Sequence, residues 1–231
     1  MKKLLATLVL FLAAFAFHSA KAQETSSEAK ALINKGSALE KAGDIAGAEQ
    51  CYVQAAEMGV HSAWILAGNL YAPAVSAKPN AKKAIEYLEK GVLHDQRAAV
   101  LLGLTYYLGD DHTQPNYLKA LTYLKKASEI GVASANGIVG NIYAMGGYGV
   151  APDPDQALLW LMPAAENGDA NAMYNCGLIL INGTQSLDPD PQEGLNYVKK
   201  AAAKGLKAAQ KWCLGGTLVT VFHRFSPPKQ F

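Results

Sequence analysis

The sequence predicts an all-α protein, a solenoid of about five helix-turn-helix repeats followed by a C-terminal cap. The first observation is a period: alanines recur at intervals of 35, 37, 37 and 37 residues, at Ala63, Ala98, Ala135, Ala172 and Ala209. The second is a glycine five residues after each of the first four, at Gly68, Gly103, Gly140 and Gly177. Self-similarity at a fixed period of this length is the signature of a helical repeat array.

Each repeat also predicts a second helix that opens with an N-cap. Four residues before a small residue of that helix stands an Asp or Asn, at Asp44, Asn80, Asn116, Asp153 and Asp190. These types are favoured because the side-chain oxygen accepts a hydrogen bond from a backbone N–H of the first turn. The helix ends are marked by glycines suited to left-handed caps, at Gly59, Gly131, Gly168 and Gly205.

Aromatic residues recur at one position of each helix, at Tyr71, Tyr106 and Tyr143 in the first helices and at Tyr87, Tyr123, Trp160 and Tyr197 in the second. A small residue on one helix lets its partner approach closely, and a ring then fills the space beside it. We therefore expect the repeated rings to belong to the core. Two residues of the second helices depart from the repeat pattern. Pro163 should kink its helix or lift its first turns, and Gly194, in place of alanine, should weaken its helix by about 1 kcal/mol.

Three cysteines do not form a disulfide framework. Cys176 and Cys213 occupy an apolar position of the first helix and are expected to be buried free thiols. Equivalent positions in stacked helices lie about 10 Å apart, whereas a disulfide requires Cα atoms within about 7 Å.

The N-terminus has the three-part layout of a secretory signal peptide: Lys2 and Lys3, an apolar run from Leu4 to Phe17, and a small-x-small signal at Ala20-Lys21-Ala22. The predicted organisation is a signal peptide over 1–22, a first repeat over 23–61, four repeats over 62–206, and a capping segment and tail over 207–231. We expect an exported protein, in the periplasm or outside the cell, with peripheral membrane contact at most. Without the leader the formal charge of +2 becomes about −1, which does not predict nucleic-acid binding.

The most regular unit, residues 133–169, closely resembles the Sel1-like repeat. Its parts are A-x4-G-x2-Y, a Gly-Tyr-Gly-Val turn, and P-D-P-D-Q-A-x2-W-L-x2-A-A-E-x-G. The first unit, with its shorter turn, looks instead like a tetratricopeptide repeat. The resemblance covers about residues 28–206 and implies a right-handed superhelical α/α solenoid whose concave face, lined by the first helices, holds a protein or peptide partner.

No catalytic or metal-binding constellation is visible in the sequence. The histidines beyond the leader lack metal-ligand spacing, and no nucleophile elbow, phosphate loop or dinucleotide fingerprint occurs. We therefore predict a non-enzymatic protein with no cofactor and no metal.

The candidate partner-binding face consists of apolar and amide residues that flank the repeated glycine. An asparagine donates and accepts hydrogen bonds together, which suits the backbone of an extended peptide. Packing between adjacent repeats is the alternative explanation of the same residues, and it stays open. The predicted residues are Ile65, Asn69, Tyr107, Asn141, Tyr174 and Asn175.

Two other functions stay open. Ser27-Glu28-Ala29-Lys30 matches the serine-x-x-lysine of penicillin-recognising enzymes, and a cysteine-rich secreted branch of the Sel1-like family has been linked to penicillin binding. That alternative is a protein that binds or hydrolyses β-lactams or cell-wall peptides, although the chain lacks the paired cysteine in each repeat that marks the branch. The third function is that of a secreted effector that binds a host protein. Neither the partner's identity nor the oligomeric state follows from the sequence.

Overall fold

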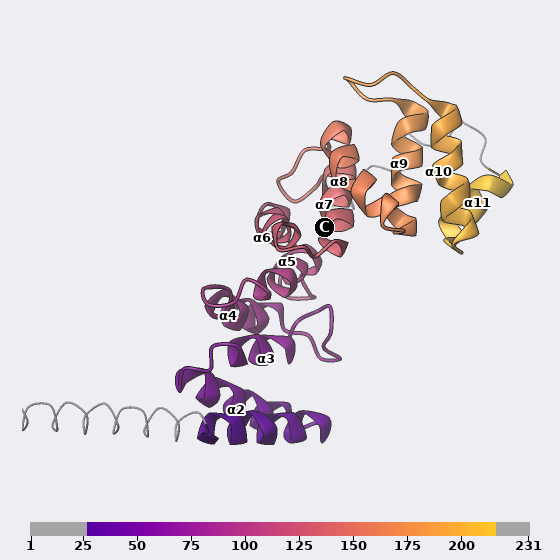
Figure 1. Ribbon diagram of the computed structural model, residues 1–231. Helices are drawn as coiled ribbons and strands as arrows, with labels where there is room; N and C mark the ends of the chain where they lie inside the picture. The colour runs from indigo at the N-terminus through magenta and orange to yellow at the C-terminus, as the bar shows by residue number, and fades with distance from the viewer. Residues whose placement is uncertain (1–26, 216–231) are drawn as a thin grey trace, which may run out of the picture. The chain divides into compact units, whose positions relative to one another are not determined.

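Each period of the sequence forms a pair of helices in the computed structural model, which describes residues 27–215 (Figure 1). The part described contains helices and turns and no strand, apart from two isolated bridges inside turns. The first pair is a helix over residues 27–41 and α2 (Ile45–Glu57). The next pairs are α3 (Ala63–Asn69) with α4 (Ala81–Val92), α5 (Ala98–Leu108) with α6 (Tyr117–Glu129), α7 (Ser134–Met145) with α8 (Pro154–Glu166), and α9 (Ala170–Asn182) with α10 (Pro191–Ala203). The last helix is α11 (Lys207–Gly215). The all-α solenoid is confirmed.

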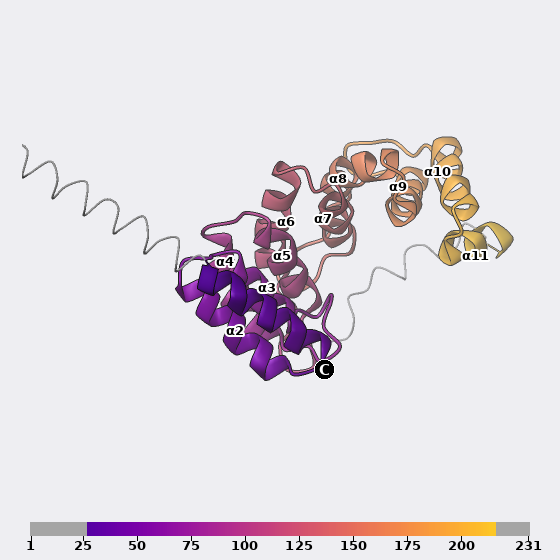
Figure 2. The same cartoon turned by 60° about the horizontal axis from the view of Figure 1, so that its bottom comes forward.

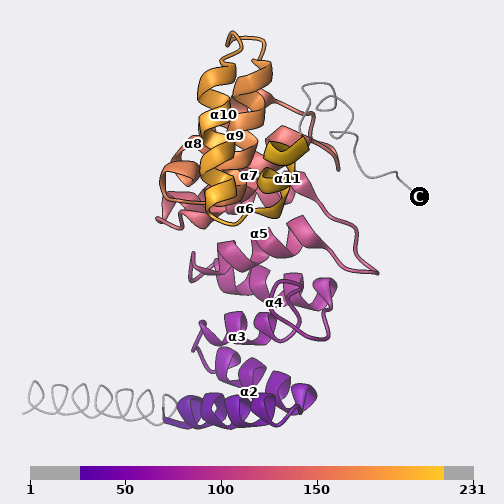
Figure 3. The same ribbon diagram turned by 90° about the vertical axis from the view of Figure 1, so that its right-hand side faces the viewer.

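The chain divides into two compact units, Met1–Ala98 and Ala99–Phe231. In the first unit α2 packs on α3 and α3 on α4, as Figure 3 shows. In the second, α7 packs on α8, α8 on α9 and α9 on α10, and α11 lies against α10 (Figure 2). Helices within a unit therefore pack mainly on their sequence neighbours, as expected for a repeat array.

The predicted caps are confirmed at both ends of the second helices. Each N-cap side chain accepts a hydrogen bond from the backbone N–H three residues on, at 2.9 to 3.0 Å, in Asp44, Asn80, Asn116, Asp153 and Asp190. The closing glycines lie in the left-handed region, with φ between +88° and +95°, at Gly59, Gly131, Gly168 and Gly205.

The repeated alanines are buried as predicted, all at most 1% exposed. The glycines allow close packing of the two helices in a pair, but the side chain that meets them is aliphatic. A Cβ added to Gly140 would lie 2.5 Å from Cγ of Leu161, and Gly103 faces Leu124 in the same way. The expectation that rings fill this space is wrong in that respect. Most of the repeated rings are half-buried at the edge of the core, at Tyr71, Tyr87, Tyr123, Tyr143, Trp160 and Tyr197, while Tyr106 is buried.

The two departures in the second helices have different outcomes. α8 continues as a helix through Pro163. Gly194 has a packing role that its helix propensity did not suggest, because a Cβ there would lie 2.6 Å from the backbone oxygen of Gly177. The pair of facing glycines lets the backbones of α9 and α10 approach closely (Figure 1).

The cysteines are free, but only two of the three are buried. Cys176 is 0% exposed, as predicted, and Cys51 is buried as well. The prediction of a buried Cys213 is wrong, because α11 has no second helix packed on it within residues 27–215. The predicted signal peptide and the tail beyond Gly215 lie outside the described residues. Over the described range, no helix combines the length and the apolar character that crossing a membrane requires.

Candidate functional site

The six predicted binding residues are all partly exposed and lie on the first helices of their repeats. The first unit contains Ile65 and Asn69, both on α3. The second contains Tyr107 on α5, Asn141 on α7, and Tyr174 and Asn175 on α9. Each unit therefore offers its own part of the predicted face.

Asn141 and Asn175 are brought together although they are 34 residues apart. Nδ2 of Asn175 donates a hydrogen bond of 2.6 Å to Oδ1 of Asn141, across the contact between α7 and α9. Within the described residues this bond leaves the Nδ2 donors of Asn141 and Oδ1 of Asn175 without a hydrogen-bond partner. The pair therefore presents a donor and an acceptor side by side, which is the complement of a peptide group.

Tyr107 belongs to a cluster of three tyrosines. Its ring stacks on Tyr117 of α6 at a centroid distance of 5.3 Å, and Tyr148 meets Tyr117 edge-on at 4.9 Å. Burial raises the pKa of Tyr107, and burial together with the two neighbouring tyrosines raises the pKa of Tyr117 to about 12. The side chains of Tyr107 and Tyr117 are therefore neutral hydrogen-bonding groups at neutral pH.

The turn that carries Tyr148 is held in an unusual conformation. Gly147 and Gly149 have φ of 104° and 89°, and Tyr148 between them has φ of 47°, the one positive value for a residue other than glycine in the described chain. Such a conformation persists only where the surroundings enforce it. Here the ring contact with Tyr117 and the two flanking glycines do so.

Two of the remaining three predicted residues are engaged in packing. A Cβ added to Gly91 would lie 3.3 Å from Cγ1 of Ile65, so Ile65 packs on α4. Tyr174 packs against the apolar cluster around α9 and α10. The third, Asn69, has a buried Oδ1 with no partner among the described residues, which packing does not explain.

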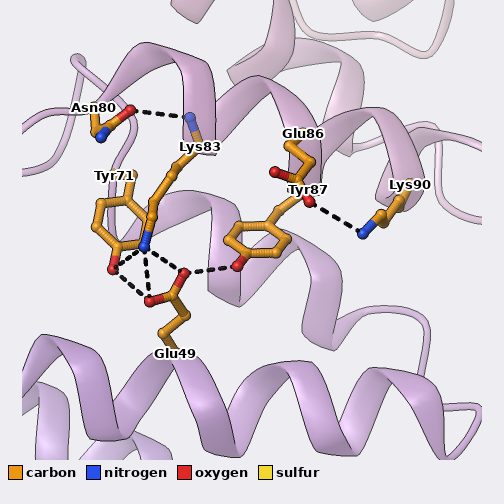
Figure 4. A network of polar contacts seen from close by, with 7 residues as sticks. All are labelled: Glu49, Tyr71, Asn80, Lys83, Glu86, Tyr87 and Lys90. Carbon is orange, nitrogen blue, oxygen red and sulfur yellow. Dashed lines mark hydrogen bonds and ion pairs between the residues drawn. The ribbon is translucent and has the colours of Figure 1, made fainter.

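A network around Glu49 in the first unit was not predicted. Tyr71 and Tyr87 donate hydrogen bonds of 2.8 and 2.6 Å to the Glu49 carboxylate, and Lys83 Nζ lies 2.9 and 3.0 Å from its two oxygens (Figure 4). Burial favours a higher pKa of Glu49, but the bonds from Tyr87, Lys83 and Tyr71 outweigh it and hold the pKa below its usual value of 4.5. Burial and the bond to Glu49 raise the pKa of both tyrosines.

The sequence contained a signal for this network. Glu49 follows the repeated small residue of the second helix, where the other repeats have an aliphatic residue, at Ile85, Leu121, Leu158 and Leu195. A carboxylate at a half-buried aliphatic position requires polar partners. Tyr71, Tyr87 and Lys83 of the next repeat supply them. With four hydrogen bonds from three side chains on its two oxygens, Glu49 serves to join α2 to α4 and to the turn after α3. Its lowered pKa does not suit a general base at neutral pH.

The candidate catalytic and metal-ligating residues are not assembled into a site. Ser27 and Lys30 are both exposed on the first turn of the helix over 27–41. His61 and His94 stack with parallel rings at 3.7 Å, a geometry in which their in-plane lone pairs do not converge on one ion. The described residues contain no group of three His, Cys, Asp or Glu side chains that could hold a metal. A cavity of about 360 Å³ lies over α10, away from the predicted face, and is lined by Asp190, Gln192, Glu193, Leu195, Asn196 and Lys199.

Comparison with protein families finds the Sel1 repeat five times, at residues 32–60, 61–94, 96–132, 133–169 and 170–206. The match includes the first unit, for which a tetratricopeptide-like repeat was expected. Among curated proteins, none matches the chain.

Several solved structures resemble the chain, among them the following three. A protective antigen of uropathogenic Escherichia coli strains that displays an SLR fold aligns with a TM-score of 0.64 and 21% identity, over 80% of this chain and 42% of that one. A Sel1 repeat protein from Oxalobacter formigenes aligns at 0.56 and 23%, over 79% and 76%. The MamA protein aligns at 0.57 and 22%, over 81% and 96%. At these identities the likeness shows the fold alone, and the chain spans less than half the length of the first of these structures.

Proposed function

Because the chain belongs to the Sel1 repeat family, whose members are generally scaffolds for protein–protein interaction, we propose that it is an exported, non-enzymatic adaptor. Its first-helix face in the second unit binds an extended peptide segment of a partner in the cell envelope. The observation that carries the proposal is the Asn141–Asn175 pair. It joins consecutive repeats, and it retains the Nδ2 donors of Asn141 and the Oδ1 acceptor of Asn175 for a ligand.

The chemistry of this face favours a peptide over a charged ligand. A peptide group offers one N–H and one C=O, and these match the unpaired acceptor of Asn175 and the unpaired donors of Asn141. The tyrosine cluster around Tyr107 and Tyr117 contributes rigid rings that lose little conformational entropy on binding. The pKa values of these tyrosines are raised, so no negative charge develops beside the peptide at neutral pH.

The test is site-specific crosslinking in the cell. A photoreactive amino acid at position 141 or 107 should trap a discrete partner, and the same group at Leu159, which is 65% exposed on the second helix α8, should not. A peptide from the trapped region should then bind the purified protein, and Asn141→Ala with Asn175→Ala should weaken that binding at least tenfold. Equal trapping from position 159, or unchanged affinity in the double variant, would overturn the proposal.

Export is tested separately, by fractionation. The leader predicts that the protein is found in the envelope fraction or the medium and begins after Ala22. Recovery of the full-length chain with its leader from the cytoplasmic fraction would contradict the proposed location and leave the peptide-binding face to be judged on its own test.

A further inference from the structure

Positive charge is concentrated on the hairpin formed by α10 and α11. Residues 191–215 contain 5 of the 21 lysines and arginines of the chain and 1 of its 19 acidic residues. All five are lysines, and all five side chains are exposed. In residues 27–215 none of them forms an ion pair. They are Lys199, Lys200, Lys204, Lys207 and Lys211.

Apolar side chains lie uncovered beside these lysines. Leu214 is 89% exposed, and Trp212 is only partly covered by the core. Leu214 stands where the four preceding repeats have the glycine that receives their second helix, so its side chain blocks that mode of packing. Lys207, Lys211 and Leu214 follow one another at i, i+4 and i+7, and they therefore share one face of α11.

We infer that the α10–α11 hairpin is an attachment surface for an anionic lipid membrane. Clusters of four to eight Lys or Arg residues on a helix are drawn to anionic headgroups. The exposed Leu214, beside the partly buried Trp212, can enter the boundary between headgroups and acyl chains, and the long lysine side chains reach back to the headgroups. Membrane attachment uses a different surface from the one that contains the Asn141–Asn175 pair, which stays available to a peptide. The inference therefore goes beyond the proposed function.

Two features favour a lipid surface over a nucleic acid or a second copy of the chain. All five basic residues of the described hairpin are lysines, which act as point charges, whereas the planar guanidinium of arginine is the group suited to bidentate phosphate recognition. Asp44, Asp153 and Asp190 are already engaged as helix caps, each in a different repeat, so these three carboxylates do not form a joint docking face for the lysines of a second copy.

The experiment is co-sedimentation of the purified chain, without its leader, with vesicles of phosphatidylcholine alone or with about one third phosphatidylglycerol. Binding should require phosphatidylglycerol and should weaken as the salt concentration rises. The triple variant Lys204→Glu, Lys207→Glu, Lys211→Glu should lower the partition coefficient at least tenfold, and the triple glutamine variant should lower it less. Leu214→Ser should weaken the binding that persists at high salt.

The matched control is Lys30→Glu, Lys35→Glu, Lys41→Glu, which makes the same charge change on three exposed lysines of the first helix. It should retain binding within about twofold, since these three lysines are not part of the proposed surface. Equal loss in both triple variants, absence of vesicle binding, or binding to single-stranded DNA without binding to vesicles would overturn the inference. Asn141→Ala with Asn175→Ala should bind vesicles normally, which separates this result from a failure of the proposed peptide site.

Discussion

At the scale of single residues, Glu49 shows how a charged residue at a repeat position that is otherwise aliphatic creates a new interaction. The position is aliphatic in the other repeats, and the side chain of Glu49 is only 16% exposed. Its charge is retained because Tyr71, Tyr87 and Lys83 all donate to it (Figure 4). The contact therefore joins the first repeat to the second by polar bonds, at a position that is aliphatic in the other repeats.

We predict that Glu49→Gln lowers the free energy of unfolding of the first unit by about 1–2 kcal/mol, because a neutral amide is a weaker partner for Tyr71 and Tyr87. Glu49→Leu should lower the free energy of unfolding by less, since leucine occupies this position in other repeats. The side chain of Lys83 is 43% exposed and can turn to water. Urea denaturation measures both. Glu86→Gln, at an exposed ion pair with Lys90, is the control and should change stability by less than about 0.5 kcal/mol; a larger loss for leucine than for glutamine would contradict this account.

The same carboxylate makes a prediction about pH. Because the pKa of Glu49 is depressed in the folded protein, its contribution is present above its usual pKa of 4.5 and is lost as the pH falls through the lower folded value. The stability difference between the wild type and Glu49→Gln should thus be constant near neutral pH and shrink below about pH 4.5. Urea midpoints measured across this range test it, and a difference that grows on acidification would rule it out.

At the scale of elements, the contact between α9 and α10 decides whether Gly194, in place of the usual alanine, stabilises or destabilises the protein. Helix propensity predicts that Gly194→Ala stabilises α10 by about 1 kcal/mol. The structure predicts the opposite, because the new Cβ would lie 2.6 Å from the oxygen of Gly177 and 2.7 Å from Ile181. We expect a net loss of about 1–3 kcal/mol.

Thermal denaturation of the Gly194→Ala variant distinguishes the two expectations. Asn196→Ala serves as the control, since Asn196 is exposed on the same helix and alanine should there stabilise by a few tenths of a kcal/mol. A raised melting temperature for Gly194→Ala would show that propensity outweighs packing and that α9 and α10 can separate slightly at little cost.

At the scale of the whole molecule, packing between neighbouring helices within each unit should keep damage local. In a repeat array, stability is approximately a sum of the stabilities of the repeats and of their nearest-neighbour interfaces. We predict that Glu49→Gln raises hydrogen exchange in residues 27–98 and leaves the helices from α7 to α10 protected as in the wild type. Exchange measured by mass spectrometry tests this, and a uniform rise along residues 27–215 would show one cooperative unit instead.

The sequence by itself determined the repeat, its register and its caps. These features depend on local chemistry that repeats at a fixed spacing: a small residue that must be buried, as at Ala172, an oxygen that caps a helix, as at Asp153, and a glycine that can adopt positive φ, as at Gly168. Each feature can be recognised from a few neighbouring residues, and its recurrence in five repeats makes the assignment unambiguous where a single repeat would not.

The tertiary structure alone decided which polar side chains from different repeats meet. Nothing in the local sequence distinguishes Asn141 and Asn175, which pair, from Asn69, which is buried without a partner. The Glu49 network joins α2 to α4 and to the turn after α3. Cys213 is exposed because, within the described residues, no second helix packs on α11. The physical reason is that burial and hydrogen bonding are properties of the space between helices, whereas the period of a sequence specifies each helix and its neighbours but not the side chains that converge there.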